Sequence, residues 1–160
     1  MMTFRIERSP KLSEFKVSYR RRTGRASGRT KVKTPIISSQ SAADYLRTVW
    51  NHDTLELLEE FYVICLDSSN SPMGWIRVSS GGLDATSVDP RLIFAVALKA
   101  AATGIIVAHN HPSGGLTPSE EDKRVTKRLK EGANLLAIRF LDHIILTGDS
   151  AFSFADNGLL

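Results

Sequence analysis

The sequence predicts an α/β (α+β) fold with a mixed sheet flanked by helices, and three observations lead to that prediction. Segments with helical periodicity alternate along the chain with short segments rich in aromatic and β-branched residues. Two of the strand-like segments are joined by a short turn, as in an antiparallel hairpin. Several helical segments open with capping residues. Interleaved helices and strands of this kind are typical of layered architectures.

The first elements predicted are one helix and a hairpin. In TPIISSQSAADYLRTVW (34–50), Ser41 is the candidate N-cap and Asp44 occupies N3, ahead of apolar residues at helical spacing. EEFYVICLD (59–67) has the composition of a strand, SSNSP forms a turn, and MGWIRVSSGG (73–82) follows as the partner strand. These segments therefore predict a helix followed by two antiparallel strands.

A second helix and a buried strand come next. DPRLIFAVALKAAATG (89–104) predicts a helix that Asp89 caps, that has Pro90 at N1, and that Gly104 ends. The apolar run GIIVAHNH (104–111) then predicts a short buried strand.

The last part of the chain predicts a long helix and two closing strands. TPSEEDKRVTKRLKEGANLL (117–136) begins with Thr117 as N-cap, Pro118 at N1, and Glu120 completing a capping box. Residues 138–155, which read IRFLDHIILTG and then AFSFA, have the composition of strands.

The charge distribution divides the chain into a basic N-terminal arm (1–34) and a single domain (35–160). Residues 1–33 contain eleven Lys and Arg against two Glu, a net charge of +9, whereas residues 34–160 carry a net charge of −5. The stretch 16–33 holds eight basic residues and no acid. Such a run is either a solvated, flexible tail or an arm that contacts the phosphates of a nucleic acid.

Composition excludes several classes of protein. Cys65 is the only cysteine, so an intrachain disulfide is impossible, and its place in FYVICLD predicts a buried hydrophobic side chain. No stretch approaches the roughly 20 apolar residues that a membrane span requires. The N-terminal residues lack the apolar core of a signal peptide. We therefore expect a cytoplasmic protein with no membrane partner.

The segment AHNHPSGGLTPSEED (108–122) concentrates the residues that carry chemistry. On an extended strand, His109 and His111 point to the same side. Ser119 and Asp122, three residues apart, share one face at the start of the following helix. Two imidazoles and a carboxylate suit Zn²⁺ and leave a fourth position for water. The alternative interpretation is an ordinary turn followed by a helix cap.

A catalytic zinc also needs a general base, and two acids precede the first strand. Strand alternation places Glu59 with Phe61 and Glu60 with Tyr62. Because both faces of this strand are apolar, periodicity does not choose between the two. Both acids could also be solvated residues at a helix–strand junction.

The motif HNHPSG…TPSEED resembles the JAMM motif, His-x-His-x7-Ser-x2-Asp, of the JAB/MPN metallohydrolases. His109, His111, Ser119 and Asp122 occupy its four positions. The flanking segments DPRLIFAVALKAAATGIIVAHNHPSG and VTKRLKEGANLLAIRFLDHIIL are similar to the RadC branch, in its short form with only the JAB domain. The resemblance covers roughly residues 35–160.

This resemblance implies a cytidine-deaminase-like sandwich, in which helices flank a curved mixed sheet. It implies one Zn²⁺ per chain, bound by His109, His111 and Asp122. Glu59, two residues before the aromatic residue of the first strand, would deprotonate the zinc water and later protonate a leaving amine. Ser119 would stabilise the developing oxyanion by hydrogen bonding.

Three functions are compatible with these features. The first is a zinc metallohydrolase that cleaves a peptide or isopeptide bond. The second is a DNA-associated, repair-related metal-binding protein or nuclease that uses the basic residues 16–33. The third is a protein-interaction module of the same fold, for which an intact base would be unnecessary. Outside the motif, His143 is predicted to be a buried, hydrogen-bonded histidine, and Asp142 to orient a neighbouring residue.

Overall fold

A computed structural model describes residues 34–80 and 88–160, which form three helices and one five-stranded sheet. The predicted arm over 1–34 lies outside these residues except for Thr34, as does the end of the second predicted strand, Gly81 and Gly82. In chain order the elements are α1 (Ser39–Val49), β1 (Glu60–Leu66), β2 (Pro72–Ser80), α2 (Pro90–Lys99), β3 (Gly104–Asn110), α3 (Glu120–Leu135), β4 (Arg139–Leu146) and β5 (Ala151–Ser153).

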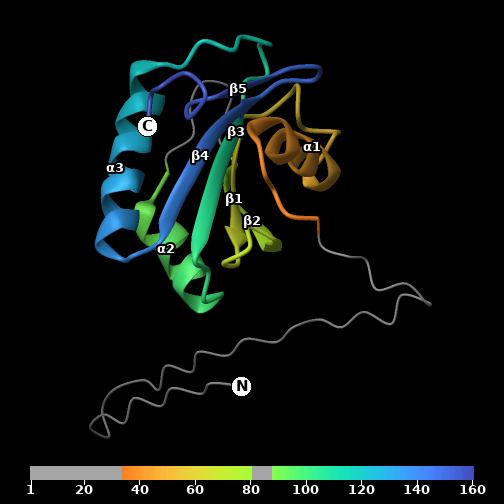
Figure 1. The fold of residues 1–160 in the computed structure, drawn as a ribbon. Helices are drawn as coiled ribbons and strands as arrows, with labels where there is room; N and C mark the ends of the chain where they lie inside the picture. Colours follow the sequence, from red (N-terminus) through yellow and green to blue (C-terminus); the bar gives the residue numbers. More distant parts are fainter. Residues whose placement is uncertain (1–33, 81–87) are drawn as a thin grey trace, which may run out of the picture. The chain divides into compact units, whose positions relative to one another are not determined.

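The sheet is mixed, with strand order β2-β1-β3-β4-β5 (Figure 1). The predicted hairpin is confirmed, because β1 and β2 pair in antiparallel fashion. β1 also pairs antiparallel with β3, and β4 with β5. Only β3 and β4 are parallel, and α3 makes the crossover between them, as parallel neighbours require.

Helices cover both faces of the sheet, α1 on one and α2 with α3 on the other (Figure 1). The expected sandwich is therefore confirmed. Alternate residues of β1 and β3 face opposite layers, so each strand is buried along its whole length. The layer under α1 contains Leu46, Trp50, Tyr62, Ile64 and Ile106. The layer under α2 and α3 contains Phe61, Val63, Ile93, Val107 and Leu129.

Two predicted N-caps are wrong, one by three residues and the other by two. α1 is capped by Ser38, and the predicted cap Ser41 is instead the N3 residue whose side chain completes the capping box. α3 is capped by Ser119, with Asp122 at N3, whereas Thr117 was predicted as the cap. In both cases two overlapping segments that begin with serine or threonine fit the pattern of an N-cap. The helix begins at the one whose N3 side chain accepts a hydrogen bond from the backbone of the cap residue.

The start of α2 agrees with the sequence, but its end does not. Asp89 accepts a hydrogen bond from the backbone of Arg91, and Pro90 is the first helical residue, as predicted. The helix ends at Lys99 because Ala101 adopts a left-handed conformation, with φ of 52°. Gly104, the predicted end, is the first residue of β3.

Cys65 lies in the core layer beneath α2 and α3, with 3% of its surface exposed. Burial raises the pKa of its thiol to about 11. The prediction that it is a buried hydrophobic side chain is confirmed. None of the helices in residues 34–80 and 88–160 combines the length and apolar character of a membrane-spanning helix.

Candidate metal centre

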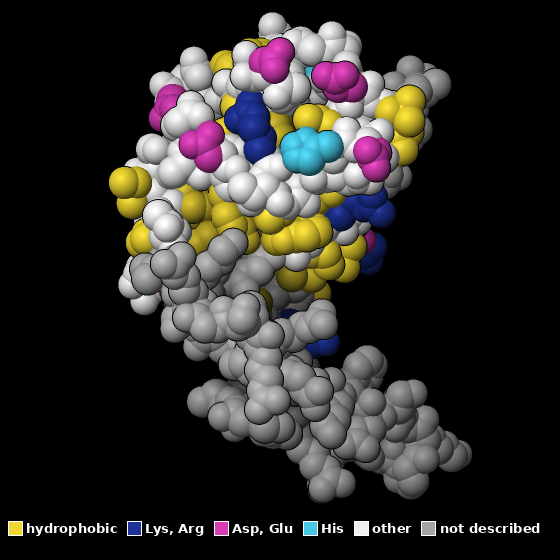
Figure 2. Space-filling model, turned by 90° about the vertical axis from the view of Figure 1, so that its right-hand side faces the viewer, with side chains coloured by type: hydrophobic (Ala, Val, Ile, Leu, Met, Phe, Trp, Pro, Cys, Tyr) yellow, Lys and Arg dark blue, Asp and Glu magenta, His cyan; other side chains and the backbone are white. Residues whose placement is uncertain are grey.

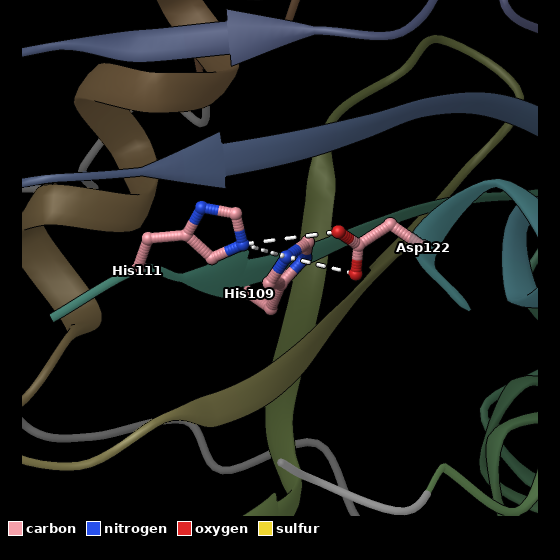
Figure 3. Close-up of side chains that lie close together, drawn as sticks. All are labelled: His109, His111 and Asp122. Carbon is pink, nitrogen blue, oxygen red and sulfur yellow. Dashed lines mark hydrogen bonds and ion pairs between the residues drawn. The ribbon is translucent and has the colours of Figure 1, made fainter. Parts of the chain in front are cut away.

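The two histidines of the motif lie at the carboxyl end of β3. His109 is within the strand and only 1% exposed, and His111 is the first residue after the end of the strand. Their Nε2 atoms are 2.9 Å apart, so both rings point to one place, as the two-residue spacing predicts (Figure 3). Phe61 pairs with His109 across the β1–β3 ladder, and its ring stacks on the imidazole with centroids 6.2 Å apart. This packing fixes the plane of the His109 ring.

Asp122 reaches the same place from the first turn of α3. Its Oδ1 lies 3.2 Å from Nε2 of His109, and its Oδ2 lies 3.8 Å from Nε2 of His111 (Figure 3). Three candidate ligand atoms therefore lie within 4.8 Å of one another. Ligands of a tetrahedral zinc ion are about 3.3 Å apart, given zinc–nitrogen bonds of about 2.05 Å. The observed separations bracket that value, so the three side chains fit a metal ion.

The helix cap positions this carboxylate. The backbone N–H and the hydroxyl of Ser119 both donate to Oδ2 of Asp122, each at 2.7 Å, while the Ser119 hydroxyl accepts from the Asp122 backbone at 3.1 Å. Oδ1 is thereby turned toward His109. Burial alone would raise the pKa of the Asp122 carboxyl. A hydrogen bond from His109 and the charge of that ring, together with the hydrogen bonds from Ser119, hold this pKa well below its usual range.

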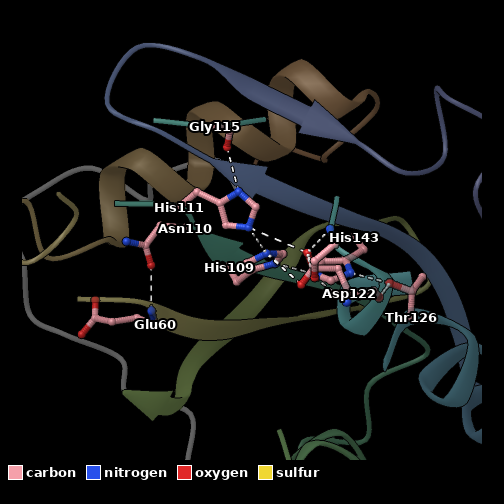
Figure 4. Close-up of polar contacts among 9 residues, drawn as sticks. Glu60, His109, Asn110, His111, Gly115, Asp122, Thr126 and His143 are labelled. Atoms are coloured by element: carbon pink, nitrogen blue, oxygen red, sulfur yellow. Dashed lines mark hydrogen bonds and ion pairs between the residues drawn. The ribbon is translucent and has the colours of Figure 1, made fainter. Parts of the chain in front are cut away.

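A carbonyl group orients the ring of His111. Its Nδ1 lies 2.7 Å from the backbone oxygen of Gly115, which can only accept, so Nδ1 carries the proton (Figure 4). Nε2 of His111, the atom that faces His109 and Asp122, is then the ring nitrogen that remains for a metal ion. The turn that brings Gly115 back over the ring includes Gly114 at φ of 79°, a conformation that favours glycine.

His143 and Thr126 extend the cluster beneath the candidate ligands. Nδ1 of His109 lies 2.8 Å from Nε2 of His143, and Nδ1 of His143 lies 2.6 Å from the Thr126 hydroxyl (Figure 4). His143 is fully buried and stacks on Phe154, and burial lowers its pKa well below the usual value. It is a buried, hydrogen-bonded histidine as predicted, but its direct contact with His109 was missed.

The structure distinguishes the two acids before β1. Glu60 is buried on the α1 side of the sheet, where it pairs with Arg77 and accepts a hydrogen bond from Thr54. Glu59 is partly exposed and immediately precedes β1. Strand alternation gives Glu59 the parity of Phe61, the residue that pairs with His109. The assignment of Glu59 as the base stays a prediction, and Glu60 is committed to other contacts.

Asn110, between the two histidines, points to the opposite side and holds the chain around Glu59. Its amide nitrogen donates to the carbonyls of Leu55 and Leu58 at 2.6 and 2.8 Å. Its side-chain oxygen accepts from the backbone N–H of Glu60 at 2.7 Å (Figure 4). The peptide groups on both sides of Glu59 are thus anchored to the strand that carries the candidate ligands.

The remaining predicted residues lie near the cluster in different ways. Ser119 is the N-cap of α3, where Thr117 was predicted, and its hydroxyl donates to Oδ2 of Asp122. Its predicted hydrogen bond to an oxyanion stays a prediction. Asp142 does orient its neighbours: it accepts from the backbone of His143 and Ala155 and from the Ser153 hydroxyl. These contacts join β4 to the end of β5 and to the residues that follow it.

Comparison with known proteins gives a matching family profile and several similar proteins. A family profile described as a RadC-like JAB domain matches residues 36–159. A UPF0758 protein of Flavobacterium johnsoniae is 45% identical over 101 residues, which cover 63% of this chain and 44% of that protein. One from Porphyromonas gingivalis is 47% identical over 103 residues (64% and 45%), and one from Staphylococcus carnosus is 43% identical over 129 residues (81% and 55%). The chain therefore matches about half the length of these relatives.

Proposed function

Because the chain belongs to the RadC-like JAB domain family, we propose that it is a zinc-dependent hydrolase that cleaves a peptide or isopeptide bond. The observation that carries this proposal is the convergence of one carboxylate and two imidazole nitrogens on one point. His109, His111 and Asp122 hold one zinc ion per chain. Two nitrogen ligands and one oxygen ligand, with room for a further ligand, are typical of catalytic rather than structural zinc sites.

A zinc ion bound there supplies a Lewis acid that lowers the pKa of water and polarises a carbonyl group. The residues of the chain perform the proton transfers. Glu59 accepts the proton of the attacking water and returns it to the leaving nitrogen. Its partial exposure beside the strand that carries the ligands supports this role, and so does the anchoring of its backbone by Asn110.

Ser119 has two roles in this proposal. It holds Asp122 in the orientation of a ligand through the hydrogen bonds of the cap. When substrate is bound, its hydroxyl turns to donate to the oxygen that becomes negative in the transition state. The backbone N–H of Ser119 continues to bind the carboxylate, so Asp122 stays in place while the hydroxyl moves.

The test uses protein that has been stripped by a chelator and reloaded with one equivalent of zinc. Fluorescence-quenched peptide libraries and a lysine-linked isopeptide serve as probes. Glu59→Gln should keep the zinc and lose cleavage by about 10²–10⁴-fold, the usual contribution of a general base. Glu60→Gln is the matched control, and it should retain cleavage when folded. Unchanged cleavage by Glu59→Gln would contradict the role of Glu59, and no cleavage of any probe by the zinc-loaded protein would contradict the proposed reaction.

The basic stretch 16–33 supports a second candidate function, the binding of nucleic acid. Its eight basic residues contrast with the net charge of −5 over 34–160. On the side of α1 and β2, acidic and basic side chains are interspersed above a band of apolar ones (Figure 2).

Binding of duplex DNA at several salt concentrations tests this second function. The slope of log K against log salt is negative, and each lost phosphate contact reduces its magnitude by about 0.9. Replacement of Arg20, Arg21 and Arg22 by Gln should therefore weaken binding and flatten its salt dependence. Equal binding and an equal slope in wild type and variant would contradict a role for this stretch.

A further inference from the structure

We infer that His143 and Thr126 are positioning residues that fix the proton of His109 on Nδ1 and so present its Nε2 as a metal ligand. The inference rests on the proposed metal site and adds two residues outside its motif. Three hydrogen bonds form a chain from the ring of His109, through His143 and Thr126, to the backbone carbonyl of Asp122.

The direction of this chain follows from its carbonyl end. The Thr126 hydroxyl donates to the carbonyl oxygen of Asp122 at 2.6 Å, and a carbonyl can only accept. The hydroxyl has one proton, so toward His143 it acts as the acceptor. Nδ1 of His143, at 2.6 Å from that hydroxyl, must therefore carry a proton.

The same reasoning continues to His109. A neutral His143 that is protonated on Nδ1 has its lone pair on Nε2, so His109 donates its Nδ1 proton across the 2.8 Å contact. A second proton on His143 would place a charge on a fully buried ring that stacks on Phe154, which is costly. Nε2 of His109, the atom 3.2 Å from Oδ1 of Asp122, is consequently the ring nitrogen that remains for a metal ion.

Both ends of this chain of hydrogen bonds lie on candidate ligands, the ring of His109 at one end and the backbone of Asp122 at the other. His143 reaches this position because β3 and β4 pair in parallel, with Val107 opposite His143. Thr126 lies one turn after Asp122 on α3, and its side chain is buried. Three elements thus fix the relative positions of two ligands and the tautomer of one, before any metal binds.

The tautomer can be measured in metal-free protein by the nitrogen chemical shifts and couplings of the imidazole rings. In the wild type, His109 should be protonated on Nδ1. Thr126→Val has nearly the same shape and removes the acceptor for His143, so the Nδ1 tautomer of His109 should lose population. Thr126→Ser keeps the hydroxyl and is the matched control, with the tautomer of the wild type. Backbone spectra establish that each variant is folded.

Zinc affinity, measured by competition with a chromogenic chelator, gives the second readout. Loss of a residue that orients a ligand usually costs 10–100-fold in metal affinity. Thr126→Val and His143→Leu should show a loss in that range. Thr126→Ser and His143→Gln should remain within about threefold of the wild type, since the Gln side chain restores an acceptor near His109.

Two results would overturn the inference: a wild-type His109 without a proton on Nδ1, or a folded Thr126→Val protein that binds zinc as tightly as the wild type. Failure of the metal site itself is a separate result. If wild-type protein binds no zinc, the proposed function is wrong, while the tautomer in metal-free protein still decides the direction of the hydrogen-bond chain.

Discussion

Replacement of Asn110 by Ala removes three buried hydrogen bonds at once. The side chain is fully buried and joins β3 to Leu55, Leu58 and Glu60 over 2.6–2.8 Å. Each such bond contributes about 1 kcal/mol net, and a buried group left without a partner adds to the loss. We expect Asn110→Ala to lower the free energy of unfolding by about 3–4 kcal/mol. For a protein of this size, that corresponds to a fall in Tm of about 10 °C.

Chemical denaturation followed by circular dichroism measures this change. Asn134→Ala is the matched control, because Asn134 is exposed on α3 and alanine is a better helix former. Its free energy of unfolding should stay within about 0.5 kcal/mol of the wild type. A loss below about 1 kcal/mol for Asn110→Ala would refute the reasoning that this side chain anchors the segment around Glu59.

Two substitutions and the reactivity of Cys65 test other parts of the structure. Glu60→Gln breaks its ion pair with the half-exposed Arg77, and urea denaturation should show a loss of about 1–2 kcal/mol; an unchanged midpoint would contradict the buried pairing. Gly132→Ala should destabilise by about 1–3 kcal/mol in thermal melts, because its Cβ would lie 2.6 Å from the Phe94 ring; a gain in Tm would show that the ring moves aside. Cys65, with its pKa raised to about 11, should resist thiol reagents at pH 8 in native protein and react in denaturant. The unfolded thiol ionises at about pH 8.5 and the folded one only at about 11, so the free energy of unfolding should fall as pH rises between these values. Rapid modification of the native protein would contradict its burial.

The candidate ligands could be predicted from the sequence because they are held together by local geometry. The two-residue period of a strand places His109 and His111 on one side, and the first turn of the next helix brings Asp122 to them. Even the wrong cap did not disturb this prediction. Thr117 and Ser119 begin overlapping cap patterns, and with either as the cap Asp122 lies in the first turn of α3.

The supporting residues could not be predicted, because they depend on pairing between distant segments. His143 meets His109 only because β4 lies parallel to β3, a pairing that spacing along the chain does not specify. The contacts of Glu60 with Arg77 on β2 and Thr54 before β1 likewise could not be predicted, because strand periodicity did not distinguish Glu60 from Glu59. The early end of α2 at a left-handed Ala101, a conformation usually left to glycine, has no signal in composition.

The zinc content of protein dialysed against buffered zinc tests the central claim most directly. Wild type and His52→Ala, which changes an exposed histidine outside the cluster, should each bind one zinc ion per chain. His111→Ala removes one of the three ligands and should bind at least about 100-fold more weakly. A wild type without zinc, or a His111→Ala variant that binds zinc as tightly as His52→Ala, would contradict the assignment of this cluster as a metal centre.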